Sequence, residues 1–436
     1  MHNIHSSLTG FRHQTISERR SALSAAIDVD LVQLEAALDA GGLSVADADK
    51  VVENVIGTYG IPYGLALNFT INGSDYAVPM VVEEPSVIAA ASNAAKLVRA
   101  SGGFWAKCDD SVMAAQVQVY DVVDVPAAVA RIREARQTLL DKAAHVLSHL
   151  VQLGGGPRDL EVRVVSSSML VVHIYIDCLD AMGANMVNTA AEALGDDITA
   201  LARGKRGLRI LSNLCDRRLV RVGCRVAAGA VVDRSSAKQP APTDEQAESV
   251  VDAIVNGSRF AELDPYRAVT HNKGIMNGID PVVIATGNDW RAVEAGAHAY
   301  ASRRGGYAPL AVWSKEKDEQ GTWLRGEMEL PLALGIVGGT LRVHPIARLS
   351  LKVLGVTSAK QLAMVAACTG LASNLAAVRA LATVGIQRGH MALHARSVAL
   401  EAGAQAGEVD VVAQRLTRDG NTTVEHALRV LQELRG

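Results

Sequence analysis

The sequence predicts an α+β fold, in which a large domain of mixed helices and strands carries an inserted ferredoxin-like domain and ends in a helical segment. Between about residue 112 and residue 211, the expected elements follow the order β-α-β-β-α-β. Helices and strands alternate on both sides of this stretch, and the chain from about residue 385 reads as helical. With 436 residues, 49% of them hydrophobic, the chain can bury a large core and is expected to form two or more domains.

Local signals place the first elements in order. Helical periodicity covers 17–27 and 28–42, and Ser44 with Asp47 resembles a capping box for a helix that runs toward Gly57. The next segment, "NFTINGSDYAVPMVVEEPS", predicts a β-hairpin, because its Asn-Gly pair suits a type I′ turn between two β-prone runs. A helix that begins at proline then follows and continues to Gly102.

The inserted domain is expected to contain a strand near 112, a long helix over about 126–152, two strands, a helix over about 184–203 and a last strand. The strand "RLVRVGCRV" leads the chain back to the large domain, and the Ser/Pro-rich stretch "DRSSAKQPAPTDEQ" reads as a linker. We therefore expect a large domain over 1–111 and 221–384, a small domain over 112–220 and a C-terminal domain over 385–436.

Composition excludes several classes of protein. The net charge of -3 and the absence of a basic stripe interleaved with aromatics argue against a nucleic-acid partner. The five cysteines are scattered, with no CxxC pair and no zinc-ligand spacing, which predicts buried thiols in a reducing cytoplasm and no metal site. No stretch stays apolar long enough to indicate a membrane span, and the most apolar region, 361–386, is interpreted as a buried helix.

The first candidate for chemistry is Lys273, in the glycine-spaced segment "HNKGIMNGID". We expect irregular backbone there to point the side chain inward, where an ammonium needs a carboxylate partner. Asp289, after the apolar run that ends in "IATGND", could supply it, so the two groups are predicted to lie within hydrogen-bonding reach. A surface lysine near a loop remains the alternative interpretation.

Two further candidates are a carboxylate and a histidine. Glu84 stands where a strand hands over to a helix and could deliver a proton, although a first-turn acid more often stabilises the helix N-terminus. His390 and His394 are one helical turn apart, but HxxxH without a third ligand is a weak metal signal. We interpret His390 as a single proton donor, with a capping or solvated histidine as the alternative.

A glycine-containing turn in "DAMGAN" places Asp180, Gly183 and Asn185 just before a helix, where free N–H groups favour a phosphate. A second turn, "LGGGPRD", lies at 153–159. Neither has the GxGxxG spacing that follows the first strand of a Rossmann fold. On spacing alone, a helix-capping turn is the other interpretation of both.

Taken together, these segments resemble the hydroxymethylglutaryl-CoA reductase family, in its soluble bacterial class II form. The matching motifs occur in family order along nearly the whole chain: "ENVIGT" (53–58), "VVEEPS" (81–86), "DAMGAN" (180–185), "DPYRAVTHNKGIMNGID" (264–280), "ATGNDWRAVEAGAHAYA" (285–301), "GIVGGT" (335–340) and "GIQRGHMALHAR" (385–396).

The resemblance implies a reaction and a set of residue roles. The reaction is the interconversion of hydroxymethylglutaryl-CoA (HMG-CoA) with mevalonate and CoA by two hydride transfers from a nicotinamide cofactor. It implies that Lys273 stabilises the developing oxyanion, Asp289 tunes this lysine, Glu84 donates protons and His390 protonates the CoA thiolate. Four positions match the binding of the hydroxymethylglutaryl group: Ser86, Arg267, Thr270 and Asn277.

The resemblance also assigns the cofactor to the small domain, through Asp180, Met182, Gly183 and Asn185. NADH-using relatives carry an Asp on the preceding helix, which accepts from the ribose 2′-OH and repels a 2′-phosphate. Leu147 occupies that place here, flanked by His145, Ser148 and His149. The resemblance favours NADH, while the histidines could accommodate NADPH.

The family further implies a cytoplasmic homodimer, or a higher assembly of dimers, with the active site at the subunit interface and the C-terminal domain acting as a flap. Two rival functions use the same residues. One is a CoA-thioester transferase or hydrolase without hydride transfer, and the other is a non-catalytic CoA-binding protein. The joint presence of a lysine, two acids and a histidine in these motifs argues against the second.

Overall fold

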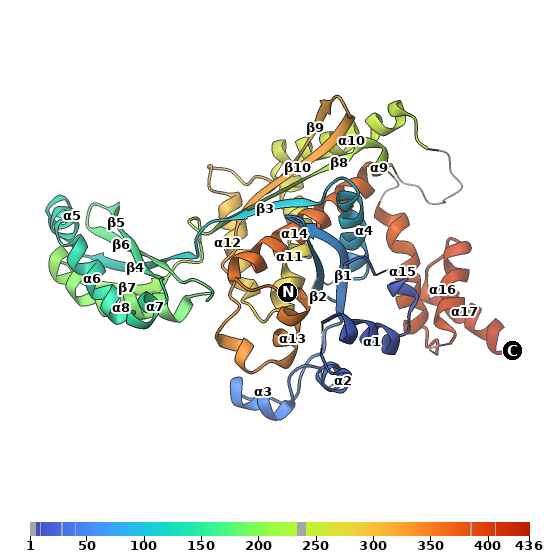
Figure 1. Ribbon diagram of the computed structural model, residues 1–436, viewed down its shortest axis with the longest axis horizontal. Coiled ribbons are helices and arrows are strands. Elements are labelled where there is room, and N and C mark those ends of the chain that lie inside the picture. Colours follow the sequence, from blue (N-terminus) through green and yellow to red (C-terminus); the bar gives the residue numbers. More distant parts are fainter. Residues whose placement is uncertain are drawn as a thin grey trace.

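The computed structural model of the chain describes residues 6–8, 10–27, 29–39, 41–232, 241–383, 386–405 and 407–436, without the side chains of 340, 342 and 386–393. The molecule is elongated, with a large central body, a smaller lobe that projects from one end and a group of helices at the other (Figure 1). This arrangement confirms the predicted α+β fold with an inserted small unit.

The large body contains a six-stranded mixed sheet in the order β2-β1-β3-β8-β10-β9. Its strands are β1 (Tyr63–Ile71), β2 (Ser74–Val81), β3 (Phe104–Cys108), β8 (Leu219–Ala227), β9 (Ala311–Asp318) and β10 (Gly321–Pro331). The expected hairpin is confirmed, since Asn72 and Gly73 take the positive φ angles, 50° and 80°, that a type I′ turn needs. Cys108 pairs with Val220, so both connections to the small lobe leave this sheet side by side.

A layer of helices packs against this sheet and forms the main hydrophobic core. These helices are α4 (Val87–Arg99), α9 (Ala228–Val231), α10 (Asp244–Leu263), α11 (Pro265–Ala285), α12 (Trp290–Ala301), α13 (Pro345–Leu354) and α14 (Ala359–Ala382). By length and composition α14 could cross a membrane, but 78% of its apolar window is buried inside the fold. It is the central core helix, as the sequence predicted.

The small lobe has a four-stranded antiparallel sheet in the ferredoxin-like order β5-β6-β4-β7. Its elements are β4 (Val112–Tyr120), α5 (Val125–Glu134), α6 (Arg136–Val146), α7 (Ser148–Gln152), β5 (Gly156–Ser166), β6 (Met169–Asp177), α8 (Ala184–Ala202) and β7 (Lys205–Leu211). The prediction of one long helix over about 126–152 was wrong, because the chain turns at Ala135 and Leu147. Both are good helix formers, so packing rather than propensity sets these breaks.

Helices also form both ends of the chain. The N-terminal ones are α1 (Ile16–Ile27), α2 (Leu31–Asp39) and α3 (Val45–Val51), and the C-terminal ones are α15 (Ile386–Glu401), α16 (Val409–Arg418) and α17 (Val424–Arg435). Ser44 caps α3 as expected, but that helix ends at Val51 rather than near Gly57. The C-terminal helices bury a small core of their own against one another.

Candidate active site

The helix α11 carries most of the predicted site, and its regularity corrects the expectation of irregular backbone around Lys273. Asp264 caps the helix by accepting the N–H of Tyr266 at 2.8 Å, and a proline occupies its first turn. Gly278 is needed for close packing and does not interrupt the helix. A Cβ there would lie 2.4 Å from the carbonyl oxygen of Thr369. The glycine therefore lets α14 cross close to α11.

Four predicted substrate and catalytic residues share one face of α11. Arg267, Thr270, Lys273 and Asn277 follow one another at spacings of three, three and four residues. Side chains at these spacings line up along one side of a helix. The helix therefore places these four residues, which are not adjacent in the sequence, side by side in one continuous polar stripe.

The stripe meets Glu84, which follows β2. The Nζ of Lys273 lies 2.9 Å from Oε2 of Glu84, and the Nδ2 of Asn277 donates to the same oxygen at 3.4 Å. The lysine side chain is 60% exposed and that of Glu84 is 36% exposed, so the expectation of an inward-pointing, buried ammonium was wrong. An ion pair this exposed adds little to folding stability, and its value lies in placing the two groups together.

Asp289 does not pair with Lys273 in the described part of the chain, which corrects the prediction that the two lie within hydrogen-bonding reach. Its carboxylate caps α12 by accepting the N–H of Ala292 at 3.1 Å and lies 3.8 Å from the guanidinium of Arg291. The reason is the regular helix. About 18 Å of α11 separates Lys273 from Ala285, where the helix ends.

Ser86 is held in a strained conformation at the start of α4. This helix begins at Val87 and not at Pro85 as predicted, because Ser86 takes a left-handed φ of 76° as its N-cap. Its buried Oγ has no hydrogen-bond partner among the described residues. A non-glycine residue in this region costs of order 1–3 kcal/mol, and such strain is concentrated at functional sites.

Arg267 is the unpaired cation of the stripe. Burial lowers the pKa of its half-buried guanidinium, and in the described chain no carboxylate or other acceptor binds it. Unsatisfied donors in this position suit the bidentate binding of a carboxylate.

The predicted cofactor residues lie at the N-terminus of α8 on the small lobe. Gly183 is its N-cap with φ 107°, and no side chain among the described residues caps the helix. A Cβ at Gly183 would lie 2.4 Å from Sγ of Cys178, so only glycine fits there. Uncapped N–H groups of a 19-residue helix are the donor set that a phosphate needs, and Asn185 lies in this first turn.

Asp180 and Met182 hold this turn to the large body. Asp180 accepts the N–H of Ala359, at the start of α14, at 2.8 Å, and its own carbonyl accepts the N–H of Ile336 at 2.9 Å. The carbonyl of Met182 accepts from Arg218 at 3.1 Å. These contacts hold the turn in place, and the binding of a cofactor by Asp180 and Met182 stays a prediction.

Leu147, which was predicted at the cofactor site, does not offer its side chain to a ligand there. Its side chain is 7% exposed and belongs to the hydrophobic core of the small lobe. The chain turns at Leu147 between α6 and α7, which leaves His145, Ser148 and His149 exposed around it. The side chain of His390, on α15, lies outside the described residues, so its position relative to the stripe stays a prediction.

Sequence reasoning missed a partly buried carboxyl pair between α11 and α12. Burial raises the pKa of Asp280 to about 8, and its hydrogen bond with Glu294 adds to the shift. Glu294 lies 2.7 Å from Nε2 of His298, whose Nδ1 is 2.6 Å from the hydroxyl of Tyr307. Asp280 follows Asn277 by three residues, and this spacing indicated that the two lie near each other on one helix. The partner of Asp280, Glu294, lies on α12, so local spacing could not reveal the pair.

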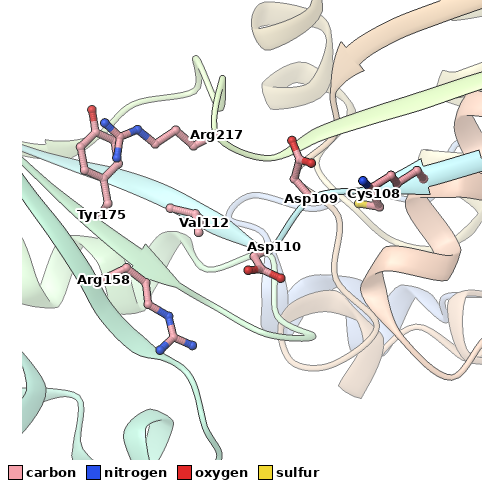
Figure 2. A pocket seen from close by; sticks show the side chains of 8 residues that line it. Cys108, Asp109, Asp110, Val112, Arg158, Tyr175 and Arg217 are labelled. Carbon is pink, nitrogen blue, oxygen red and sulfur yellow. The ribbon is translucent and has the colours of Figure 1, made fainter.

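A hollow of about 510 Å³ lies between the two lobes and contains none of the predicted residues (Figure 2). Its lining consists of Lys107, Cys108, Asp109, Asp110, Val112, Arg158, Tyr175 and Arg217. Arg217 stacks on the ring of Tyr175 at 3.4 Å from its centroid, and Arg158 is paired with Asp177 at 2.9 Å. The lining carries three cations and two carboxylates, both of its arginines are already engaged, and burial raises the pKa of Cys108 to about 11, so we assign no chemistry to the hollow.

A polar stripe on the large body and a helix N-terminus on the inserted lobe define a two-lobed protein with a candidate polar ligand site and a candidate phosphate site. The family described as Hydroxymethylglutaryl-coenzyme A reductase matches residues 15–395. The 3-hydroxy-3-methylglutaryl-coenzyme A reductase of Archaeoglobus fulgidus is 46% identical over 99% of this chain and 95% of its own length. A probable reductase of Borreliella burgdorferi is 32% identical over 89% of this chain and 85% of its own.

Solved structures of hydroxymethylglutaryl-coenzyme A reductases are also similar to this chain. A 3-hydroxy-3-methylglutaryl-coenzyme A reductase from Streptococcus pneumoniae superposes with a TM-score of 0.81 at 41% identity, covering 98% of this chain and all of that one. A class II reductase from the same organism, bound to NADPH in open conformations, gives 0.79 at 42% identity, with 97% and 100% covered. The chain belongs to the hydroxymethylglutaryl-coenzyme A reductase family. It is an oxidoreductase that converts HMG-CoA to mevalonate.

Proposed function

We propose that the Glu84–Lys273 pair at the polar stripe of α11 is the reacting centre of this reduction. The observation that carries the proposal is the single oxygen of Glu84 that accepts from both Lys273, at 2.9 Å, and Asn277, at 3.4 Å. An ammonium and a carboxyl group in contact can both act on one carbonyl group, each in a different role. The ammonium stabilises negative charge on the oxygen, and the acid provides its proton.

The proposed division of roles follows from these positions. Lys273 donates to the thioester oxygen and then to the aldehyde oxygen, while Glu84 supplies a proton to the oxygen being reduced. Each nicotinamide cofactor, when bound, would supply one hydride, so two cofactor molecules are used in turn. His390 is proposed to protonate the CoA thiolate as it leaves. His390→Gln should therefore slow HMG-CoA reduction more than the reduction of free mevaldehyde, and an equal loss in both would contradict the role.

The remainder of the stripe is proposed to bind the hydroxymethylglutaryl group. Arg267, with its unused donors, suits the free carboxylate of the substrate. Thr270 and Asn277 lie on the same face of the helix, and the unpaired hydroxyl of Ser86 lies two residues from Glu84. These groups fix the substrate relative to the lysine.

We propose that Asp289 is also a catalytic group, which requires that its carboxylate can reach the ammonium of Lys273. Because it caps α12 and is separated from Lys273 by the last turns of α11, it approaches that ammonium only from a second subunit or after a rearrangement of residues 286–289. We propose the first route. It fits a homodimer in which the active site lies between subunits.

Exposed apolar side chains support the proposed dimer. Leu263 is 74% exposed and Tyr266 is 87% exposed, where α10 ends and α11 begins. Large apolar side chains gathered in this way mark a protein interface, and here they lie beside the stripe.

Mixed dimers test both ideas. Lys273→Ala and Asp289→Ala proteins, each inactive alone, are mixed, dissociated and reassociated. If the two groups act from different subunits, about a quarter of the sites regain an intact pair in a two-fold dimer. Recovered activity supports the arrangement, whereas no recovery in verified mixed dimers places both groups in one subunit.

The uncapped N-terminus of α8 fits the pyrophosphate of a nicotinamide cofactor, so we propose that Gly183 and Asn185 bind it there. NADH was favoured from the sequence. However, the α6–α7 turn has no carboxylate at the place where one would repel a 2′-phosphate, and the exposed side chains beside the buried leucine are histidines and a serine. We therefore propose that NADPH is accepted as well as NADH.

We also propose that the three structural groups act as functional domains. These are the substrate-binding domain (1–111 and 221–384), the cofactor-binding domain (112–220) and the C-terminal flap (385–436). The separate cores of the small lobe and of the C-terminal helices support this division.

One assay tests the reaction and the cofactor together. The purified protein is given HMG-CoA with NADH or NADPH, and cofactor oxidation, free CoA and mevalonate are measured. The proposal predicts two cofactors oxidised per CoA released and activity with both cofactors. Release of CoA without cofactor oxidation would instead support a thioester hydrolase or transferase.

A further inference from the structure

A buried arginine lies at the junction of the two lobes. Arg218 is 2% exposed and is among the largest fully buried side chains of the described structure. It ends the connection from β7 back to β8, at the point where the chain re-enters the large sheet. Arginine is almost never fully buried unless it is paired, so its partners at this position need an explanation.

Its partners are backbone carbonyls from both lobes. Nη1 donates to Met182 at 3.1 Å and to Ala181 at 3.3 Å, and Nη2 donates to Ala181 at 3.4 Å and also to Leu334. Two of these carbonyls belong to the turn before α8, and the third belongs to the segment after β10. One planar guanidinium therefore joins two segments that are far apart in the sequence.

No carboxylate neutralises this charge within hydrogen-bonding distance in the described chain. The titratable groups nearest to it include Cys178 and Cys215, and burial raises their pKa values to about 12 and about 11, so both stay neutral thiols. Asp177 acts on Arg218 only through its charge, and its Oδ2 is already bound by Arg158. The positive charge is therefore left beside the N-terminus of α8, one residue from its N-cap.

The segments that Arg218 joins are locked together by further contacts. Ala181 pairs with Val337 as an isolated bridge between the lobes. The side chain of Asn288 accepts the N–H of Gly335 at 2.8 Å and donates to its carbonyl at 3.1 Å. Gly335 has no space for a side chain, because a Cβ would lie 2.5 Å from the backbone nitrogen of Met182. A continuous path thus runs from the turn before α8 to the residue beside Asp289.

We propose that Arg218 is a positioning residue for the nicotinamide cofactor, which fixes the 180–183 turn against residues 334–337 and adds its charge to the phosphate-binding end of α8. The inference rests on the proposed cofactor site. Loss of the guanidinium frees the turn and removes a positive charge that favours a pyrophosphate. The substrate stripe on α11 is not touched by this change.

Cofactor affinity provides the test. NADPH and NADH are titrated into the full-length protein without HMG-CoA, and the dissociation constant is measured from nucleotide fluorescence for wild type, Arg218→Met and Arg218→Lys. We expect Arg218→Met to weaken binding about tenfold or more, as the loss of charge-assisted hydrogen bonds predicts, with the KM for HMG-CoA changed less than about twofold. Arg218→Lys keeps the positive charge but loses the planar set of guanidinium donors. Its dissociation constant should therefore lie between those of wild type and Arg218→Met.

Arg217→Met is the matched control, because it removes the neighbouring arginine, which is exposed and stacks on Tyr175. It should leave cofactor binding unchanged. Gly335→Ala is the second route if Arg218→Met does not fold. It keeps the arginine but drives a methyl group against Met182, and it should weaken cofactor binding in the same selective way.

The inference is overturned if folded Arg218→Met binds both nucleotides as tightly as wild type. It is also overturned if the KM for HMG-CoA rises as much as that for the cofactor, which would indicate general damage. A wild-type protein that binds the nucleotides but oxidises neither with HMG-CoA would contradict the proposed reaction instead. In that case, the binding comparison would still decide the role of Arg218.

Discussion

Replacing Asp280 by asparagine should make the protein progressively more stable than wild type as pH rises. Asp280 follows Asn277 by three residues on α11 and shares a hydrogen bond with the carboxyl of Glu294. Burial comes first and this contact second among the causes that raise the pKa of Asp280 to about 8. Asparagine keeps a donor toward Glu294 but cannot ionise.

The sign follows from proton binding. Because the folded pKa is higher than the unfolded value of about 3.9, the native state holds a proton that the unfolded state has lost between about pH 4 and pH 8. Wild-type stability therefore falls as pH rises through this window and levels off above it. One full proton corresponds to about 1.4 kcal/mol per pH unit. The site is only partly buried, so we halve this slope and expect the advantage of Asp280→Asn to grow by about 1–2 kcal/mol from pH 6 to pH 8.

Urea unfolding followed by tryptophan fluorescence measures this change. Trp105, Trp290, Trp313 and Trp323 are the only tryptophans in the sequence and all lie in elements of the large body, so the signal reports the part that contains Asp280. The exposed Asp141 on α6 gives the control, since Asp141→Asn should shift stability equally at both pH values. If the difference in unfolding free energy between Asp280→Asn and wild type stays constant from pH 6 to pH 8, the argument that native Asp280 keeps its proton in this range is refuted.

Three further outcomes are expected. Lys273→Ala should abolish turnover in both directions with an unchanged circular dichroism spectrum, and near-full turnover would contradict the oxyanion role. Gly278→Ala should lower the unfolding free energy by about 1–3 kcal/mol, because its Cβ meets the Thr369 carbonyl, while Gly274→Ala, with open space around it, should raise stability slightly. Ser86→Gly should raise the unfolding free energy by up to about 1 kcal/mol by relieving the left-handed strain, yet lower kcat/KM for HMG-CoA.

The fold was largely predictable because its signals are local. The Asn72-Gly73 turn, the cap at Ser44 and the alternation of the inserted strands all depend on neighbouring residues. The breaks in the helix over 126–152 were not predictable, because neither glycine nor proline marks them. Tertiary packing set these boundaries against local propensity.

The candidate site was predictable in composition but not in contacts. Motif order selected Glu84, Lys273 and Asp289, but the glycines around the lysine suggested loop rather than helix, and this error placed Asp289 beside the ammonium within one chain, where Glu84 lies instead. Arg218 gave no signal at all, because a buried cation held by carbonyls looks in the sequence like any other arginine.

The regularity of α11 explains why one helix can serve both packing and chemistry. Gly278 faces α14 and permits close contact, while Lys273 and Asn277 face Glu84 from another side of the same helix. A flexible loop at this point would let the ammonium reach several carboxylates, and Asp289 would then compete with Glu84. A helix packed against the central α14 fixes the backbone of Lys273, so a partner beyond the reach of this side chain, whether the substrate or Asp289 of the proposed second subunit, has to come to it. The rigid helix is therefore a physical reason to expect that the complete active site forms between two chains.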